Sequence, residues 1–212
     1  MITGIDGSGK TTIVNKLLLK IRAEKVWIKS LHTLAYLIYI FFTKTWGKEY
    51  IINPNGKIVE HYATKWMKKL GKTWFLIEFI SILPWIILKV EIPSKYKTIV
   101  CDRYIPDFLA TTALRTGDLL TPWKTITGKF LLNYMKKTKI FLLNIKIKTL
   151  LKRRPNIEYR EKEIKTLIAL YKTIVKDINI STINTDKQTP KETIQIILQK
   201  LGVKNESNNK NN

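Results

Sequence analysis

The stretch GIDGSGKTT, residues 4–12, decides the fold because it matches the spacing G-x-x-x-x-G-K-[ST] of a phosphate-binding loop. Its glycines lack Cβ atoms, so several backbone N–H groups can turn toward the oxygens of one phosphate chain. A helix that opens at Lys10 adds the positive end of its dipole, and the Lys10 ammonium is expected to contact the β- and γ-phosphates. The Thr11 hydroxyl suits Mg²⁺. The predicted ligand is a nucleoside triphosphate.

The residues on either side of this loop fit it unequally. After the loop, an apolar stripe at helical spacing predicts an amphipathic helix, formed by Ile13, Val14, Leu17, Leu18 and Ile21. Only residues 1–3 precede the loop, whereas a central parallel strand usually runs about five residues. We therefore expect a short leading strand whose start is truncated.

Length and charge favour a one-domain enzyme over a nucleic-acid-binding protein. The 212 residues can bury one sizeable core. There are 38 Lys and Arg against 16 Asp and Glu, a formal net charge of +22, which by itself suggests an anionic partner. However, the 32 lysines are scattered along the chain, 32 isoleucines match them, and no recognised nucleic-acid motif accompanies them. We interpret them as solvated faces and expect no specific nucleic-acid partner.

The expected compartment is the reducing cytoplasm. Cys101 is the sole cysteine and lies in an apolar run, so it is interpreted as a buried strand residue rather than a disulfide or zinc ligand. The phosphate-binding loop starts almost at the first residue, so no signal peptide is expected before it.

Two apolar stretches raise the question of a membrane. Residues 31–42 are too few to span a bilayer, and residues 74–90 contain Glu78 and Pro84. We interpret both as buried helices. A weak membrane-surface contact by these aromatic-rich helices, with basic residues beside them, stays open as the alternative.

The rest of the chain alternates strand and helix patterns, which is typical of a parallel sheet with crossover helices. Apolar runs predict strands at 25–30, 98–101, 140–145 and 178–183; longer patterns predict helices at 60–70, at 73–88 with a kink at Pro84, and at 164–178. Thr189 to Glu192 form a capping box that opens a last helix, which Gly202 ends. Residues 1–202 are thus predicted as one domain, and residues 203–212 as a disordered polar tail.

A second motif, Asp102-Arg103-Tyr104, follows the apolar strand predicted at 98–101. In an open parallel sheet, ligands bind outside the carboxyl ends of the strands. An Asp at that edge can hold Mg²⁺ and its waters, and an Arg can hold phosphates in a bidentate fork. The alternative is an Asp that caps the following helix and pairs with the Arg.

A third motif is rich in arginine. Arg153, Arg154 and Arg160 fall within eight residues, and only three other arginines occur in this lysine-biased chain. The planar guanidinium stays ionised and binds phosphate bidentately, so it suits transition-state charge. We predict a lid that closes over the phosphates and excludes water, with a solvated basic loop as the alternative.

Together these segments resemble the thymidylate kinase family of nucleoside monophosphate kinases. The resemblance rests on GIDGSGKTT, TIVCDRY, RRPNIEYREKE and the closing INTDKQTPKETIQIIL, which together span nearly the full length. It implies an α/β P-loop NTPase fold of three layers, with about five parallel strands flanked by helices, a small mobile lid at about residues 153–161, and often a homodimer. The implied reaction transfers the ATP γ-phosphate to dTMP, giving dTDP and ADP.

Position by position, the resemblance implies a role for each motif residue. ATP would contact Asp6, Gly7, Ser8, Gly9, Lys10, Thr11 and Thr12, and Mg²⁺ would be held by Thr11 and Asp102. The acceptor would contact Asp6 through its sugar and Arg103 through its phosphate, with Tyr104 in the same site. Some family members carry an arginine where this chain has Gly7, and others supply it from the lid. That implies Arg153, Arg154 or Arg160 as the transition-state donor here.

The acceptor half departs from the family pattern. Residues 29–33, KSLHT, stand where an Arg-Glu-Pro-Gly stretch is usual, and Asp107, Thr111 and Thr112 stand where a Ser and a Tyr-Gln pair are usual. Three functions therefore stay open: a dTMP kinase, a thymidylate kinase-like phosphotransferase with a different and membrane-proximal acceptor, and a non-catalytic NTP-binding module. The retained Lys10, Asp102 and lid arginines argue against the last.

Overall fold

The computed structural model describes residues 1–28, 30–178 and 180–203. Lys29 in the strand predicted at 25–30, Asn179 in the strand predicted at 178–183, and residues 204–212 of the predicted tail lie outside the described residues.

A five-stranded sheet forms the centre of the molecule, and every neighbouring pair of its strands is parallel. The order is β2-β5-β1-β6-β7, with bounds Ile2–Thr3 for β1, Glu24–Trp27 for β2, Ile99–Asp102 for β5, Phe141–Asn144 for β6 and Ser181–Asn184 for β7. The middle strand β1 is only two residues long, and Ile2 lies opposite both Asp102 and Phe141. The predicted α/β fold with five parallel strands is confirmed.

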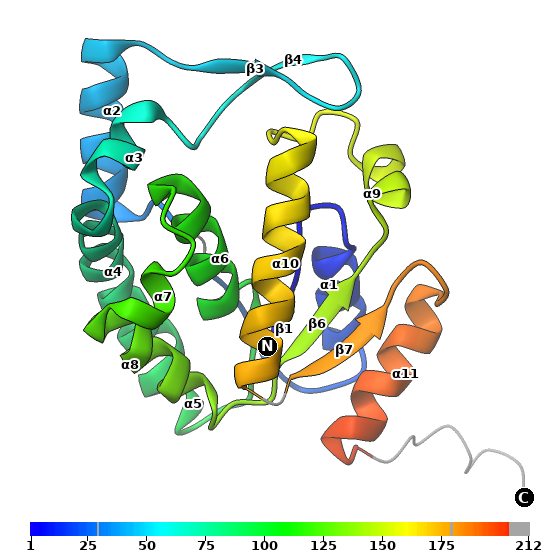
Figure 1. Cartoon of the computed structure of the whole chain (residues 1–212). Helices are drawn as coiled ribbons and strands as arrows, with labels where there is room; N and C mark the ends of the chain where they lie inside the picture. Colours follow the sequence, from blue (N-terminus) through cyan, green and yellow to red (C-terminus); the bar gives the residue numbers. More distant parts are fainter. Residues whose placement is uncertain (29, 179, 204–212) are drawn as a thin grey trace, which may run out of the picture.

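Helices cover both faces of this sheet, so the fold has three layers (Figure 1). On one face, α1 (Lys10–Leu18) and α11 (Pro190–Leu201) contact each other over a small apolar core. The other face carries α6 (Ile105–Thr116), α8 (Ile126–Met135) and α10 (Glu161–Asp177) over the larger core. The short helices α7 (Thr121–Lys124) and α9 (Ile147–Arg153) complete this part of the fold. The capping box at Thr189 and the end at Gly202 are confirmed for α11.

A second group of helices lies beside the sheet and has its own core. It comprises α2 (Thr33–Trp46), α3 (Lys65–Leu70) and α4 (Lys72–Ile86), which bury Tyr39, Trp66 and Trp74. Helix α4 runs through Pro84 and continues as a π-helical turn, Ile87–Glu91, and then as α5, Ile92–Ser94. Within the described ranges, no helix combines the length and the apolar character that crossing a bilayer requires.

The sequence-based helix at 60–70 was partly wrong. Residues 50–60 form an antiparallel hairpin, β3 (Tyr50–Ile52) with β4 (Ile58–Glu60), and the helix begins only at Lys65. The turn is closed by the Asn53 N–H donating to the Lys57 carbonyl at 2.8 Å. Figure 1 shows this hairpin reaching across to the loop between α9 and α10. The hairpin depends on contacts with that distant loop. The helical periodicity of residues 60–70 does not reveal these contacts, so the predicted helix began too early.

Candidate functional site

The phosphate-binding loop links β1 to α1 and has backbone angles that glycine favours. Gly4 has φ 139° and Gly9 has φ 93°, in the region that L-residues with a Cβ rarely adopt. At Gly4 a Cβ would also lie 2.5 Å from the Leu143 carbonyl oxygen of β6. The loop therefore fits closely against the carboxyl ends of the central strands, where open parallel sheets bind ligands.

Lys10 is buried inside this loop, with 4% of its surface exposed. Its Nζ donates to the carbonyl oxygens of Gly4 at 2.5 Å and Ile5 at 2.9 Å, and lies 3.6 Å from Asp6 Oδ1. Burial, followed by the positive charge of Arg103, lowers the pKa of Lys10. The ammonium is thus held at the loop by neutral carbonyls and one carboxylate, and a triphosphate is a stronger acceptor than a carbonyl.

Asp6 brings several cations together at this point. Besides Lys10 it forms ion pairs with Arg103, which follows β5, and with Arg154, whose Nη1 lies 3.4 Å from Asp6 Oδ2. Arg103 has φ 71°, a strained angle for a residue with a Cβ. Burial opposes its charge, but the carboxylates of Asp6 and Asp107 outweigh burial and raise the pKa of Arg103. The guanidinium is held charged next to the loop.

The lid segment predicted at about 153–161 lies against the phosphate-binding loop through Gly7. Gly7 has φ 92°, and a Cβ there would lie 2.8 Å from Leu150 Cδ1 of α9. Arg153, the last residue of α9, donates to the Thr185 carbonyl at 3.1 Å, and Arg154 donates to Glu158 at 3.0 Å. The missing side chain at residue 7 is therefore what lets α9 approach the loop this closely.

Two adjoining cavities meet at this loop. The first, which we call the phosphate cavity, has about 310 Å³ and is lined by Gly7, Gly9, Lys10, Thr11, Thr12, Arg103, Arg153 and Arg154. The second has about 290 Å³ and shares Gly9, Thr12 and Arg153 with it, adding Ser8, Ile13, Thr185, Gln188, Pro190 and Thr193. Of the three lid arginines, Arg160 lines neither cavity, and its guanidinium lies 3.6 Å from Glu163. The structure thus brings Arg153 and Arg154, but not Arg160, to the loop.

Asp102 and Thr11 were the predicted Mg²⁺ ligands. The Asp102 side chain is 1% exposed, and its Oδ2 lies 3.3 Å from Lys25 Nζ of β2. Its Oδ1 has no hydrogen-bond partner among the described residues. A buried carboxylate oxygen without a partner fits a hydrated cation, because Mg²⁺ keeps waters and uses one or two carboxylates. The donor set thus fits Mg²⁺, and Lys25 is a neighbour that the sequence did not indicate.

Tyr104, predicted in the acceptor site, is fully buried in the larger core. Its hydroxyl has no hydrogen-bond partner within the described ranges, and it lines neither of the two cavities. The neighbouring Asp107 instead accepts from the Thr3 hydroxyl at 2.6 Å and the Tyr171 hydroxyl at 2.9 Å. Tyr104 therefore lies where it supports the strand end rather than where a ligand would touch it.

A further cavity, which we call the aromatic cavity, lies beside the acceptor segment. It has about 350 Å³ and is lined by Trp27, Ser30, Leu31, His32, Thr33, Tyr36, Tyr39, Tyr62 and Arg115. His32 stacks on Trp85 with ring centroids 5.5 Å apart. Leu31 and Thr33 have φ 64° and φ 39°, so this segment is strained. An aromatic wall with one cation suits a planar, polar ring.

A buried polar network holds Arg115 at this cavity. Arg115 Nη1 donates to Ser30 Oγ at 2.7 Å and lies 3.2 Å from Glu78 Oε1. Glu78 also accepts from Trp74 Nε1 at 2.6 Å and Thr112 Oγ1 at 2.8 Å. Sequence reasoning missed this network because its members lie on three separate segments, although a charged residue inside the apolar run 74–90 was a signal.

Tyr159 of the lid is within electrostatic reach of both ends of the site. Burial and then the negative charge of Asp6 raise the pKa of its hydroxyl, and the charges of Arg115 and Arg103 act on it in the opposite sense. Arg103 lines the phosphate cavity and Arg115 lines the aromatic cavity.

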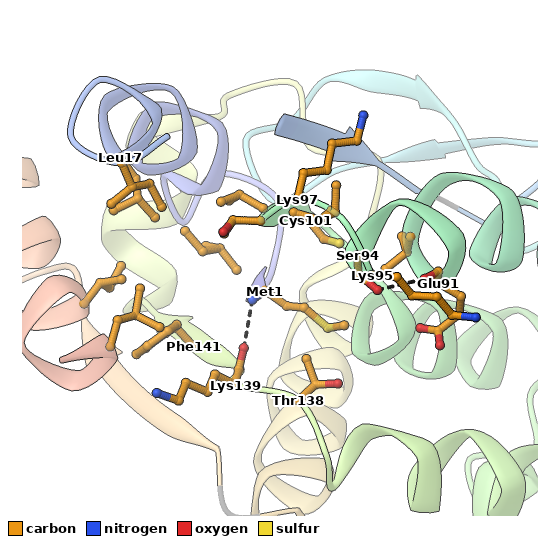
Figure 2. Close-up of a pocket in the computed structure, with 18 of the residues that line it drawn as sticks. Met1, Leu17, Glu91, Ser94, Lys95, Lys97, Cys101, Thr138, Lys139 and Phe141 are labelled. Atoms are coloured by element: carbon orange, nitrogen blue, oxygen red, sulfur yellow. Dashed lines mark hydrogen bonds between the residues drawn. The ribbon is translucent and has the colours of Figure 1, made fainter. Parts of the chain in front are cut away.

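A cavity of about 540 Å³ opens at the amino-terminal ends of the central strands, away from the phosphate-binding loop (Figure 2). Met1, Cys101 and Phe141 line it, and the Met1 ammonium donates to the Lys139 carbonyl at 2.8 Å. Because β1 pairs only through Ile2 and Thr3, the amino-terminal halves of its neighbours β5 and β6 flank this space. Burial raises the pKa of the Cys101 thiol to about 11, as expected for a buried strand cysteine.

Solved structures with the same architecture are kinases and a nucleotide complex. The thymidylate kinase from Candida albicans is similar at 15% identity and a TM-score of 0.60, covering 95% of this chain and 89% of that one. The deoxyadenosine kinase from M. mycoides with bound dATP is similar at 15% identity and TM-score 0.55, covering 95% and 97%. The YorR protein from Bacillus subtilis, in complex with phosphorylated GDP, is similar at 15% identity and TM-score 0.54, covering 95% and 94%.

The chain has the fold of P-loop nucleoside and nucleotide kinases. No family model matches the sequence, and no curated protein matches it either. At 15% identity the likeness to these solved structures carries the fold, and the function has to be argued from the site.

Proposed function

We propose that this protein is a nucleotide kinase that transfers the γ-phosphate of ATP to a nucleoside monophosphate, with dTMP as the first acceptor to test. The observation that carries the proposal is the convergence of Lys10, Arg103 and two lid arginines on one cavity at the phosphate-binding loop. Phosphoryl transfer must bring two anions together in line. Cations on several sides of the cavity offset their repulsion.

Each cation has a distinct task in this mechanism. Lys10 binds the donor phosphates, and Arg103, held charged by Asp6, binds the acceptor phosphate. Arg153 lines both adjoining cavities and so holds the donor nucleotide along its length. Arg154 enters the phosphate cavity opposite Asp6 and is the proposed donor to the equatorial oxygens of the transferred group. An arginine supplied in this way is worth about 10³ to 10⁵ in rate in related chemistry.

Thr11 and Asp102 are the proposed metal ligands, and Lys25 forms an ion pair with Asp102. When bound, Mg²⁺ offsets the charge of the phosphates and orients them. Thr11 lies on the wall of the phosphate cavity, and the carboxylate of Asp102 is close enough to Lys10 to influence its pKa.

A phosphate acceptor fits this site better than the hydroxyl of a free nucleoside. A hydroxyl needs a general base, whereas a phosphate oxygen is already an anion. The carboxylate at the phosphate cavity, Asp6, is committed to Lys10, Arg103 and Arg154. Its partners hold it as an anion that organises cations, and no free base is required of it.

A second candidate is a thymidylate kinase-like phosphotransferase with a different, membrane-proximal acceptor. The aromatic cavity favours a planar ring in either case, but the apolar surface next to it is large: Leu37 and Phe41 of α2 are each 65% exposed, and Ile80 of α4 is 51% exposed. Such a surface needs a partner. Under the first candidate we expect a second copy of the chain to cover it, and under this second candidate a lipid surface would cover it.

An acceptor screen tests the proposal. The purified protein is incubated with ATP and Mg²⁺ and with each of dTMP, dUMP, dCMP, dGMP and dAMP, and the corresponding nucleosides, and products are identified by mass spectrometry. We expect dTDP to form fastest. If only the nucleosides are phosphorylated, the acceptor is a nucleoside and not the proposed nucleoside monophosphate. ATP binding without turnover of any acceptor would instead leave a non-catalytic NTP-binding module.

The expected homodimer is tested separately by light scattering after size-exclusion chromatography. Leu37→Glu and Phe41→Glu should convert a dimer into a monomer while the circular dichroism spectrum stays the same. A monomeric wild type that sediments with anionic liposomes, and is released by moderate salt, would favour the lipid surface through lysine electrostatics.

A further inference from the structure

The hairpin of β3 and β4 touches the lid through its tip, residues 53–57. Its two strands expose Tyr50, Ile52 and Ile58 on their outer side, so they do not form part of either sheet-side core. The tip, however, lies against residues 151–157, which include the end of α9 and the start of the lid loop. The tip is therefore the part of the hairpin that is bonded to the lid.

Asn53 is the centre of this contact. It is 3% exposed, and its Nδ2 donates to the Pro155 carbonyl at 3.0 Å and the Ile157 carbonyl at 3.2 Å. Its Oδ1 accepts from the N–H groups of Asn55 and Lys57, each at 3.0 Å. All four hydrogen-bonding positions of the amide are used, two for the hairpin turn and two for the lid.

Exposed side chains of the tip add to the same contact. Asn55 Nδ2 donates to the Pro155 carbonyl at 3.1 Å and the Leu151 carbonyl at 3.3 Å, and Lys57 Nζ donates to Asn156 Oδ1 at 2.8 Å. At the base of the hairpin, His61 Nε2 lies 3.0 Å from Glu163 Oε1 at the start of α10. The hairpin is thus bonded to the lid loop and to the helix that follows it.

The two carbonyls bonded by Asn53 lie within three residues after the arginines that line the phosphate cavity. Pro155 is the next residue after Arg154, whose guanidinium spans from Asp6 to Glu158. Residues 154–160 form no regular helix or strand, so their carbonyls depend on partners outside the loop. Fixing these carbonyls fixes the backbone from which Arg154 extends, which lowers the ordering cost of placing its side chain.

We propose that Asn53 is a positioning residue for the lid: through its two donors, the hairpin tip holds the backbone at residues 155–157 so that Arg154 faces the phosphate cavity. The proposal rests on the proposed kinase function for its kinetic consequence, but the contact itself can be tested without catalysis. It also gives the inserted hairpin a task in the active site that no local sequence pattern reveals.

The test is Asn53→Asp, which keeps the Oδ1 acceptor of the turn and removes the two donors to the lid. Asn133→Asp, at an exposed position of α8, is the matched control because it makes the same chemical change away from the lid. Lys152, Arg153 and Arg160 are trypsin sites in the lid. We expect N53D to be cut there at least severalfold faster than wild type, and N133D to be cut at the wild-type rate.

Kinetics supply the second measurement. A misplacement on the order of 1 Å can cost about 10²-fold, so we expect kcat of N53D to fall about ten- to hundredfold with a smaller change in the KM for ATP. Asn55 is exposed, so Asn55→Asp should change lid cleavage and kcat in the same direction as N53D but by smaller factors. Unchanged lid cleavage, or unchanged kcat despite faster cleavage, overturns the proposal. If wild type turns over no acceptor, the kinase function fails, and lid cleavage alone decides whether Asn53 holds the loop.

Discussion

The phosphate cavity and the aromatic cavity differ in the chemical groups that line them. The first is lined by two glycines of the phosphate-binding loop, by the start of α1 and by cations, most of which share the carboxylate of Asp6. The second is a ring of aromatic side chains from β2, α2 and neighbouring segments around one buried ion pair, Arg115 with Glu78. Under the proposed function, the phosphate cavity would bind the phosphate chain of any nucleotide, and the aromatic cavity would select the ring.

This difference separates chemistry from selectivity. Backbone N–H groups and ammonium ions recognise phosphate oxygens, which every nucleotide carries. Side chains in a half-enclosed pocket recognise the edge of one ring, because an unmatched polar group is left without a partner. Changes at the phosphate cavity should therefore alter the rate for all acceptors alike, and changes at the aromatic cavity should alter their ranking and the stability of the fold.

The largest expected effect is at the aromatic end. Arg115→Met leaves the carboxylate of Glu78, which is 1% exposed, without its cation. Removing one partner of a buried pair costs about 3–5 kcal/mol, and urea denaturation should show that loss in the free energy of unfolding. The KM for the acceptor should rise, whereas the KM for ATP should stay unchanged.

The double variant Glu78→Gln with Arg115→Met is its control. With no buried charge left uncompensated, part of the lost stability should return, as a double-mutant cycle would measure. Equal stability of R115M and wild type would mean that the pair contributes nothing to the fold, and the aromatic cavity would lose its organising cation.

The next effect is at the phosphate end. Lys10→Ala should lower kcat/KM by about 10²- to 10³-fold, the usual loss for one preorganised donor, and equally for every acceptor. Its melting temperature should change little, because the cost of burying the ammonium opposes the hydrogen bonds that it donates to the Gly4 and Ile5 carbonyls. Lys16→Ala, exposed on the same helix, is the control and should retain the full rate. If the loss of kcat/KM in K10A differs between acceptors, the phosphate cavity also contributes to acceptor selectivity, which contradicts this division of roles.

A smaller effect concerns the contact between the loop and the lid. Gly7→Ala introduces a Cβ at φ 92° and places it 2.8 Å from Leu150 Cδ1. Gly202→Ala has a similar φ of 77° but no neighbour within 4 Å. Both should lose about 1–2 kcal/mol from the strained backbone, measured by calorimetry. Only G7A should also lose activity and become more sensitive to trypsin in the lid. If G202A shows the same changes in activity and cleavage, the contact between the loop and the lid does not explain them.

The smallest effect is on pH dependence at the base of the hairpin. Burial would raise the pKa of Glu163, but hydrogen bonds from His61 and from the Arg160 N–H outweigh burial and lower it from the usual 4.5. A carboxyl whose pKa is lowered on folding stabilises the fold above its unfolded pKa, and that contribution is lost as pH falls through the folded value. Denaturation between pH 6 and about pH 3 should therefore show a flatter decline for Glu163→Gln than for wild type. Identical slopes would contradict a bond between Glu163 and the hairpin.

The parts that sequence reasoning predicted are those fixed by neighbours in the chain. The phosphate-binding loop with its helix, and the capped last helix, depend on spacing within a dozen residues, and both are confirmed as structure. The parallel sheet followed from alternating patterns of the same kind, and its five strands followed from the family resemblance; both are also confirmed. The functional roles of the loop and lid residues stay predictions.

The parts that were missed depend on contacts between distant segments. Lys25 meets Asp102 only because β2 pairs with β5, a register that no local pattern gives. Residues 53–56 read as a turn in the sequence, but the two short strands beside it were missed, because the hairpin is bonded to the lid a hundred residues later. The three lid arginines were equivalent in sequence, and only the packing of α9 places Arg153 and Arg154, rather than Arg160, on the phosphate cavity.

The contact of Leu150 with Gly7 also constrains how such a protein can change over generations. An arginine at position 7, as some thymidylate kinases carry, would occupy the space that α9 now fills. A side chain at position 7 is therefore incompatible with Leu150 as it is placed in this backbone. A lineage could acquire an arginine at position 7 only by altering residues 7 and 150 together, so these positions should covary among relatives of this chain.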